Sequence, residues 1–273
     1  VRPFRSYLSG MFRRKPWISD GAHRPYPLPD APYIMHQVWE ELLFIHYRVD
    51  PDELRRLVPE QLELDLWTGD GEAQAYVAVV PFRMRGIRPR FLPAVPWLSA
   101  FAELNVRTYV RVNGRPGVYF FSLDAANPVG VFLGRRGFHL PYQNARMRCQ
   151  AMPNPAAITF DHFEDGSDAR WLDYASVRTH RGSPAAEFRG RYGPTAPVKL
   201  AQPGTLEHWL TERYCLYSID PRGRVHRGEI HHRPWPLQSA GLELETDTMC
   251  AGHGVTVSAA EAQAPLLHFA RGI

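Results

Sequence analysis

Three polar residues alternate with apolar ones in the segment that runs from Glu103 to Tyr109. Successive side chains of a strand point to opposite faces, so Glu103, Asn105 and Arg107 share one face. Inside a barrel, a carboxylate beside an arginine stays ionised and grips a ligand. The solvated face of a half-exposed strand produces the same alternation and is its commoner cause. Both interpretations remain open at this stage.

A second polar pair lies on an apolar segment, residues 41–49, where His46 and Arg48 share one face. Two strands that carry such sets favour a barrel with a polar interior. In that setting Glu103 or His46 would act as a general base.

Histidines gather in the segment that runs from Arg227 to Trp235. His231 and His232 are adjacent, so on a strand they would point to opposite faces and would not share one ion. Glu229 could join His231, but a third ligand is not evident. We therefore predict no metal site and no cofactor. The sequence also has no G-x-S-x-G elbow, P-loop or Rossmann fingerprint.

The elements that must position these residues are mostly short strands. Residues 1–30 are rich in Pro, Arg and Gly and predict an extended arm before one domain over residues 31–273. Short helices are predicted at 50–59, with Asp50 as cap and Pro51 in the first turn, and at 205–210, with Thr205 as cap. Besides 41–49, turn signals delimit strands at 73–82, 104–112, 117–123, 145–151, 157–163, 174–179, 185–192, 213–219, 223–233 and 242–246. This order predicts a mainly β (α+β) fold, a closed or partly open antiparallel barrel with a few short helices.

Composition narrows the partners. The 273 residues carry a net charge of +4, but the arginines are scattered among 28 acidic residues, which argues against a nucleic-acid surface. No apolar run is long enough to span a membrane, and no apolar stretch follows the basic N-terminus, so we expect neither membrane association nor secretion. Cys149, Cys215 and Cys250 lack metal-type spacing and predict reduced thiols. A cytoplasmic protein is expected.

Long blocks of the chain resemble a known family. The blocks LLFIHYRVDPDELRRLVPEQLELD, VPFRMRGIRPR, ELNVRTYVR, GVYFFSLDA, LPYQNARM, PGTLEHWLTERYCLY, RGEIHHRPWPLQ and LLHFARGI occur in one order and look like those of the YqjF-like uncharacterised proteins. That family belongs to the acetoacetate decarboxylase superfamily. The resemblance covers the chain from about Tyr33 onward, and it implies the superfamily's barrel and a homo-oligomer.

The resemblance also implies roles for individual residues. Arg48 would bind a carboxylate, and Glu103 would be the pocket glutamate. Tyr119 would lie on the strand that leads to the active position. Where acetoacetate decarboxylase has paired lysines after a proline, this chain has Tyr142 and Gln143. The chain contains only Lys15 and Lys199, so a Schiff-base mechanism is not expected.

Two functions follow as hypotheses. In the first, the protein is a lyase, isomerase or hydrolase that acts on a small oxo or carboxylic acid. Glu103 or His46 would be the base, Tyr142 the proton donor, and Arg48 or Arg107 the anchor, with Asn105, Gln143 and Tyr119 also contacting substrate. In the second, the barrel binds a small acidic or oxo metabolite without transforming it. A barrel with a simply packed interior is the structural alternative.

Overall fold

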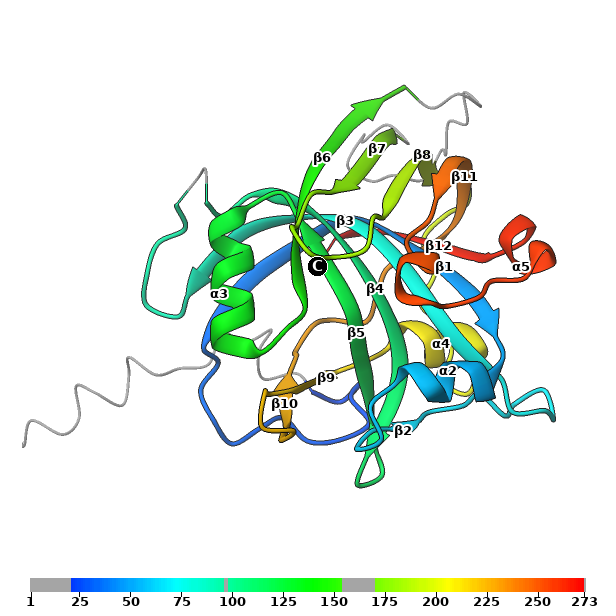
Figure 1. Cartoon of the computed structure of the whole chain (residues 1–273), viewed down its shortest axis with the longest axis horizontal. Helices are drawn as coiled ribbons and strands as arrows, with labels where there is room; N and C mark the ends of the chain where they lie inside the picture. Colours follow the sequence, from blue (N-terminus) through cyan, green and yellow to red (C-terminus); the bar gives the residue numbers. More distant parts are fainter. Residues whose placement is uncertain (1–20, 96–97, 154–169, 273) are drawn as a thin grey trace, which may run out of the picture.

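A single sheet of twelve strands dominates the computed structural model, which describes residues 21–95, 98–153 and 170–272 (Figure 1). The strands are β1 (Met35–Val49), β2 (Glu63–Leu64), β3 (Ala75–Pro89), β4 (Phe101–Val112), β5 (Arg115–Ala125), β6 (Tyr142–Met152), β7 (Trp171–Arg178), β8 (Glu187–Pro194), β9 (Cys215–Ile219), β10 (Val225–Glu229), β11 (Leu237–Asp247) and β12 (Leu266–Gly272). The helices are α2 (Pro51–Leu57), α3 (Pro128–Phe138), α4 (Leu206–Thr211), α5 (Ala259–Gln263) and the 3-10 turn η2 (Ala251–His253).

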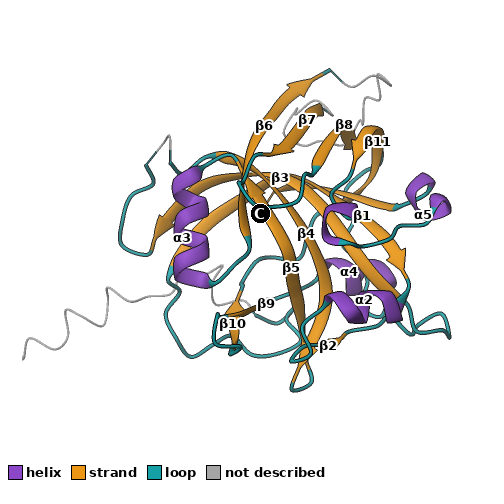
Figure 2. Ribbon diagram, in the orientation of Figure 1, coloured by secondary structure: helices purple, strands orange, loops and turns teal. Residues whose placement is uncertain are grey.

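Nine of these strands close into a barrel (Figure 2). Their order around the ring is β4-β5-β6-β7-β8-β11-β12-β1-β3, and the pairing of β3 with β4 completes it. The predicted mainly β barrel with short helices is confirmed. One pair inside the ring departs from the antiparallel expectation: β5 and β6 are parallel, because helix α3 carries the chain back between them.

Local signals explain the predicted helices. The Asp50 side chain accepts from the backbone N–H groups of Asp52 and Glu53, and Pro51 occupies the first turn of α2. Thr205 accepts from the N–H of His208 at the start of α4. Helix α3 and strand β12 were not predicted, although Asn127 followed by Pro128 is a capping signal for α3. The strand predicted at 157–163 lies outside the described residues.

The barrel wall has two unlike faces. Its lumen holds the largest apolar cluster, with side chains from strands on all sides of the ring, including Leu43, Val79, Val106, Tyr174 and Phe188. The opposite face of β1, β3, β4 and β5 is also buried, because α4 and the segment around Trp235 cover it. Both the lumen and this covered outer face can therefore hold buried polar groups.

The end of the expected arm packs onto the domain. The Arg24 side chain is buried, lies against the Tyr214 ring and forms an ion pair with Glu229 at 3.1 Å. Within the described residues, no helix has the length and apolar character needed to cross a membrane.

Candidate functional site

Five of the predicted site residues lie together on the covered outer face rather than in the lumen. We call His46, Glu103, Asn105, Arg107 and Tyr142 the outer cluster. The alternation of β4 places Leu104 and Val106 in the lumen, so the polar side chains between them must point outward. The prediction that Glu103, Asn105 and Arg107 share a strand face is confirmed. Neither of the two environments considered for that face holds, because these side chains point away from the lumen and the face is covered, not solvated.

Strand register fixes the layout of the outer cluster. His46 pairs with Ala78 and Ala78 pairs with Arg107, so the three residues form one row across β1, β3 and β4. Two strand spacings separate the ends of this row by about 10 Å. The small Ala78 side chain stands between the imidazole and the guanidinium. Along β4, Glu103 and Arg107 are four residues apart, about 13 Å, with Asn105 between them.

Glu103 and Tyr142 meet directly. The Tyr142 hydroxyl donates to Oε2 of Glu103 at 3.2 Å, and the ring packs against Gly134 of α3, where any added Cβ would collide with it. The pKa of Glu103 is raised to about 8, chiefly by burial; the hydrogen bond from Tyr142 opposes this rise, and the charge of Asp124 adds a smaller increase. Burial and the adjacent Glu103 raise the pKa of Tyr142 above its usual value. Glu103 therefore changes protonation near neutral pH while Tyr142 stays protonated.

Arg107 has no carboxylate partner among the described residues. Its Nε and Nη2 atoms are buried and donate no hydrogen bond within the described chain, and its guanidinium lies 5.4 Å from the centre of the Phe44 ring. Burial lowers the pKa of Arg107, but an arginine remains charged in a protein. A buried cation without a counter-ion is costly, so this group is prepared for an anion.

His46 and Asn105 add further unpaired polar atoms. Both ring nitrogens of the fully buried His46 lack a hydrogen-bond partner within the described residues, and so does Oδ1 of Asn105. Burial first, then the charges of His268 and Arg107, lowers the pKa of His46 well below its usual value, so the ring is neutral. Ordered water or a bound polar ligand would satisfy these atoms. Partnerless buried atoms also occur elsewhere, for example Ser176 Oγ, so the charge of Arg107 is what distinguishes this site.

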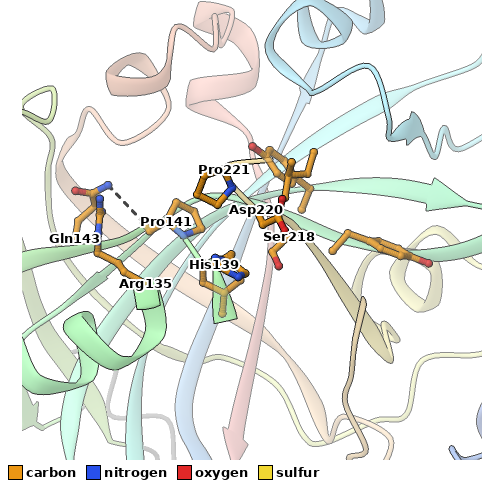
Figure 3. A pocket seen from close by; sticks show the side chains of 11 residues that line it. Arg135, His139, Pro141, Gln143, Ser218, Asp220 and Pro221 are labelled. Atoms are coloured by element: carbon orange, nitrogen blue, oxygen red, sulfur yellow. Dashed lines mark hydrogen bonds between the residues drawn. The ribbon is translucent and has the colours of Figure 1, made fainter. Parts of the chain in front are cut away.

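The other three predicted residues lie elsewhere. Arg48 is exposed at the end of β1, where its Nε is 3.2 Å from Oε1 of Glu261. The expected carboxylate-binding place in a pocket is therefore wrong for Arg48, because its strand has passed beyond the covered part of the face. Tyr119 and Gln143 line a cavity of about 440 Å³ that does not include the outer cluster (Figure 3).

This cavity lies in a notch of the barrel wall. Strand β9 pairs with Val118 and Tyr119 on one edge of β5, and β6 pairs with the same edge only from Leu123 onward. The two neighbours therefore diverge, and the side chains between them line the opening. The remaining lining residues are Arg135, His139, Leu140, Pro141, Tyr217, Ser218, Ile219, Asp220 and Pro221.

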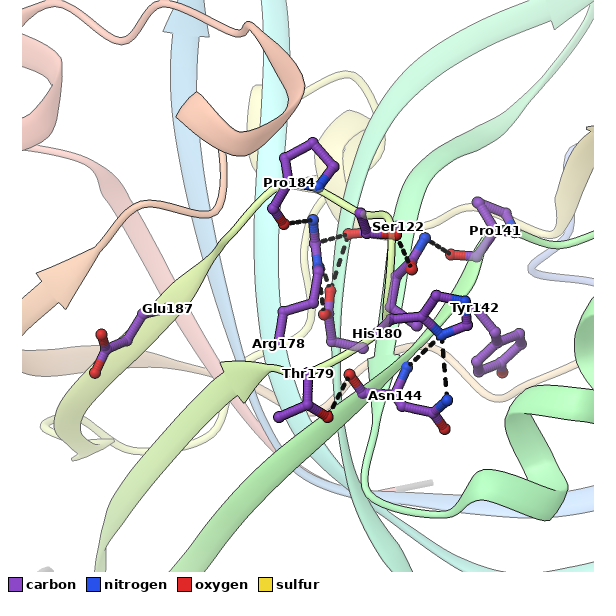
Figure 4. Close-up of polar contacts among 12 residues, drawn as sticks. Ser122, Pro141, Tyr142, Asn144, Arg178, Thr179, His180, Pro184 and Glu187 are labelled. Carbon is purple, nitrogen blue, oxygen red and sulfur yellow. Dashed lines mark hydrogen bonds and ion pairs between the residues drawn. The ribbon is translucent and has the colours of Figure 1, made fainter.

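A second polar group lies in the lumen and was not predicted. We call Ser122, Asp124, Arg178 and His253 the lumen cluster. Figure 4 shows two of its members, Ser122 and Arg178, in contact. Arg178 donates from Nε to Oδ1 of Asp124 at 2.7 Å and from Nη2 to Oδ2 at 2.8 Å, and Ser122 Oγ bonds both residues. Nε2 of His253 lies 3.0 Å from Ser122 Oγ. The spacing of Ser122 and Asp124 on β5 was the available signal, but Arg178 and His253 are distant in sequence.

In the segment from Arg227 to Trp235, which was considered for a metal, Glu229 and His232 are engaged in other contacts. Glu229 is engaged by Arg24, Arg115 and Arg227, and both ring nitrogens of His232 lie within hydrogen-bond distance of backbone carbonyls.

Comparison with known proteins places the chain. The model of DUF2071, described as an uncharacterized conserved protein (COG2071), matches residues 36–273. The uncharacterized protein YqjF of Bacillus subtilis (strain 168) is 40% identical over 244 residues, which is 89% of this chain and 90% of that protein.

Two solved structures share the fold at low identity. The enduracididine biosynthesis enzyme MppR complexed with pyruvate superposes with a TM-score of 0.52 at 16% identity and covers 89% of this chain and 87% of its own. An acetoacetate decarboxylase-like enzyme from Sphingomonas wittichii RW1 gives a TM-score of 0.51 at 14% identity, with 92% and 94% covered.

Proposed function

The chain belongs to the DUF2071 family, a YqjF-like group within the acetoacetate decarboxylase superfamily, and from this premise we propose that it is an enzyme that performs acid–base chemistry on a small oxo carboxylic acid. The single observation that carries the proposal is that Arg107 has two buried nitrogens, Nε and Nη2, without a partner in the described chain, on the same strand face as Glu103, whose pKa is raised to about 8. The pyruvate bound by the structurally similar MppR supports the substrate class by analogy of fold alone.

Arg107 would hold the substrate carboxylate. Guanidinium and carboxylate match in geometry, and a charge-assisted pair is among the strongest hydrogen-bonded contacts. Its free Nε and Nη2 atoms are the pair of donors that a bidentate contact uses. The neutral imidazole of His46, in the same row, would add a hydrogen bond to the substrate and would not place a second positive charge beside Arg107.

Glu103 would act on the carbonyl end. A substrate that lies along β4 from Arg107 passes Asn105 and brings the carbon next to its carbonyl group toward Glu103. Ionised Glu103 would take a proton from that carbon, and the C–H electron pair would move to the carbonyl oxygen. The Tyr142 hydroxyl, already held at Glu103, would donate a hydrogen bond to the enolate oxygen. Glu103 would then return its proton to the same carbon: the carbon–carbon double-bond pair of the enolate forms the new C–H bond, the oxygen pair re-forms the carbonyl, and Glu103 is left ionised again.

Schiff-base chemistry is not part of this proposal. A nucleophilic amine needs a lowered pKa, which desolvation or a neighbouring cation supplies. The Lys199 side chain is 56% exposed and its Nζ lies 3.1 Å from a carboxylate oxygen of Glu207, so it has neither. Lys15, the other lysine of the chain, lies outside the described residues.

We also propose a cytoplasmic homo-oligomer. The three cysteines are unpaired, as expected in a reducing compartment. Helix α3 exposes Val129, Phe132 and Leu133, an apolar strip of the kind that subunit contacts cover. Light scattering of the purified full chain tests the assembly directly.

Two measurements on the same samples test the enzymatic proposal. A thermal-shift panel of 2-oxo and 3-oxo acids should find a class that stabilises the wild type, by about 2.7 kcal/mol at a hundred times its dissociation constant. Deuterium exchange at the carbon beside the carbonyl, followed by NMR in D2O, should then be catalysed and rise with pH toward about 8, the pKa of Glu103.

Matched variants assign the roles. Glu103→Gln should bind the acid but lose exchange, whereas Arg107→Met should lose binding. Arg48→Met is the control, because Arg48 is exposed and paired with Glu261, and it should leave both readings unchanged. Binding without exchange would favour the non-catalytic binding barrel. No binding across the panel would remove both readings of the outer cluster.

A further inference from the structure

Outside the outer cluster, one group of side chains has the composition of a metal site. His139, Asp220 and His226 each offer one ligand atom, and the three atoms lie within 4.8 Å of one another. His139 follows α3, Asp220 begins the turn after β9, and His226 lies on β10, so the fold joins residues that are 81 and 6 positions apart.

Backbone contacts hold these three elements in place. Oδ1 of Asp220 accepts from the backbone N–H groups of Arg222 and Arg224 at 2.9 and 3.0 Å, which shapes the β9–β10 turn and leaves Oδ2 for other partners. Ser218, which pairs with His226 across the hairpin, donates from Oγ to the carbonyl of Phe138 at 2.9 Å. That bond ties the end of α3, and with it His139, to the hairpin.

The distances are close to those of a zinc site. Bonds of about 2.0–2.1 Å in a tetrahedron place neighbouring ligand atoms about 3.3 Å apart. Nε2 of His226 is 3.1 Å from Oδ2 of Asp220, and the rings of His139 and His226 have centres 5.3 Å apart. All three ligand atoms lie within 4.8 Å of one another, so binding an ion requires only a side-chain adjustment that brings them to about 3.3 Å. Two imidazoles and one carboxylate suit Zn²⁺ and not the oxygen-seeking Ca²⁺ or Mg²⁺.

An ion pair explains only part of this arrangement. Arg224 donates from Nε to Oδ2 of Asp220 at 2.7 Å, and His226 contacts the same oxygen. This accounts for Asp220, Arg224 and His226. The backbone of His139 is left-handed because it ends α3, but the ion pair does not explain why its ring faces that of His226. With a metal on Oδ2 of Asp220, the mostly exposed Arg224 would still donate a hydrogen bond to the same carboxylate and hold it in place.

We propose that His139, Asp220 and His226 bind one Zn²⁺, with the fourth position open to the neighbouring cavity. His139 and Asp220 line that cavity of about 440 Å³ together with Ser218 and Arg135 (Figure 3). Three protein ligands and one open position are the arrangement of zinc sites that bind water or a substrate oxygen. The cavity would therefore admit a small oxygen-donor ligand to the ion.

The test uses the full chain without a histidine tag, because the protein's 12 histidines are already enough background. After treatment with a chelator, Co²⁺ is titrated as the spectroscopic probe and Zn²⁺ by calorimetry. We expect one equivalent of each, a visible spectrum typical of tetrahedral cobalt, and displacement of Co²⁺ by Zn²⁺.

Variants locate the site. His139→Gln and His226→Gln should each weaken Zn²⁺ binding by more than about 100-fold. Even the loss of a residue that only hydrogen-bonds a metal ligand lowers metal affinity by about 10–100-fold. His208→Gln, on α4 and outside the group, is the matched control and should bind as the wild type does. Both test histidines are partly exposed, so their loss should not unfold the chain. No stoichiometric binding by the wild type, or equal binding by His139→Gln, would overturn the proposal and leave an ion pair.

Discussion

Two arginines with buried guanidinium nitrogens lie on opposite faces of the barrel wall and have opposite surroundings. Arg178 of the lumen cluster meets both oxygens of Asp124 and the hydroxyl of Ser122. Arg107 of the outer cluster has two buried nitrogens without a partner in the described chain. A guanidinium whose hydrogen bonds are all made within the protein stabilises the fold. A guanidinium with buried nitrogens that have no protein partner is suited to bind an anionic ligand.

The same contrast applies to the acids. Asp124 is fully buried beside a cation, while Glu103 is buried beside a tyrosine and another acid, which raises its pKa to about 8. Perturbed carboxyls of this kind are frequent at functional sites. The comparison therefore assigns stability to the lumen cluster and ligand chemistry to the outer cluster, and variants of each can break that assignment.

The largest effect is expected for Asp124→Asn. It leaves the buried Arg178 without its counter-charge, and breaking such a pair typically costs about 3–5 kcal/mol of unfolding free energy. Urea denaturation at pH 7 measures it. A cost under about 1 kcal/mol would show that the lumen cluster does not hold the barrel together.

Glu103 should make the protein less stable as pH rises. Its folded pKa of about 8 lies above the usual 4.5, so the folded state binds the proton more tightly. The stability that this group contributes is full below about pH 4.5 and is lost as pH rises through 8, by a total on the order of 5 kcal/mol. Glu103→Gln should flatten this alkaline limb of the curve of unfolding free energy against pH. An unchanged limb would contradict the raised pKa.

His253 should act with the opposite sign. Burial first, and then Arg178, lowers its pKa from 6.5 to about 4, so the folded state binds the proton less tightly. Its contribution is present above pH 6.5 and is lost as pH falls toward 4, by roughly 3 kcal/mol. In His253→Gln the acid limb should become shallower while the alkaline limb is retained. The two variants together separate the two clusters within one set of pH titrations.

The smallest change in stability is expected for Arg107→Met. Removing an unpaired buried cation should leave stability unchanged or raise it by about 1–2 kcal/mol, because the apolar side chain avoids the desolvation cost. Thermal unfolding without ligand measures it, with Arg178→Met as the destabilised counterpart. A loss as large as that of Arg178→Met would mean that Arg107 has a structural partner.

The sequence predicted the barrel because alternation and turn signals are local. It also predicted that Glu103, Asn105 and Arg107 share a face. It did not predict which face, because the cover over that face comes from α4 and the Trp235 segment, more than a hundred residues further along the chain. When both faces of a strand are buried, no solvent-exposed face indicates which side chains point into the lumen.

Partners that are distant in sequence were missed for the same reason. The pairing of Asp124 with Arg178 and the meeting of His139 with His226 depend on strand order and on the turn after β9, not on spacing. Arg48 shows the reverse error. The prediction that Arg48 shares a strand face with His46 was correct. That face is buried at His46 but exposed two residues later, at Arg48.

The most direct test of the central claim is a crystal structure with the oxo acid that gives the largest thermal shift. The carboxylate of the bound oxo acid should lie within about 2.9 Å of Nε and Nη2 of Arg107, and its carbonyl group should point toward Glu103 and Tyr142. A ligand bound only in the cavity at Tyr119 and Gln143, with Arg107 in contact with water alone, would contradict it.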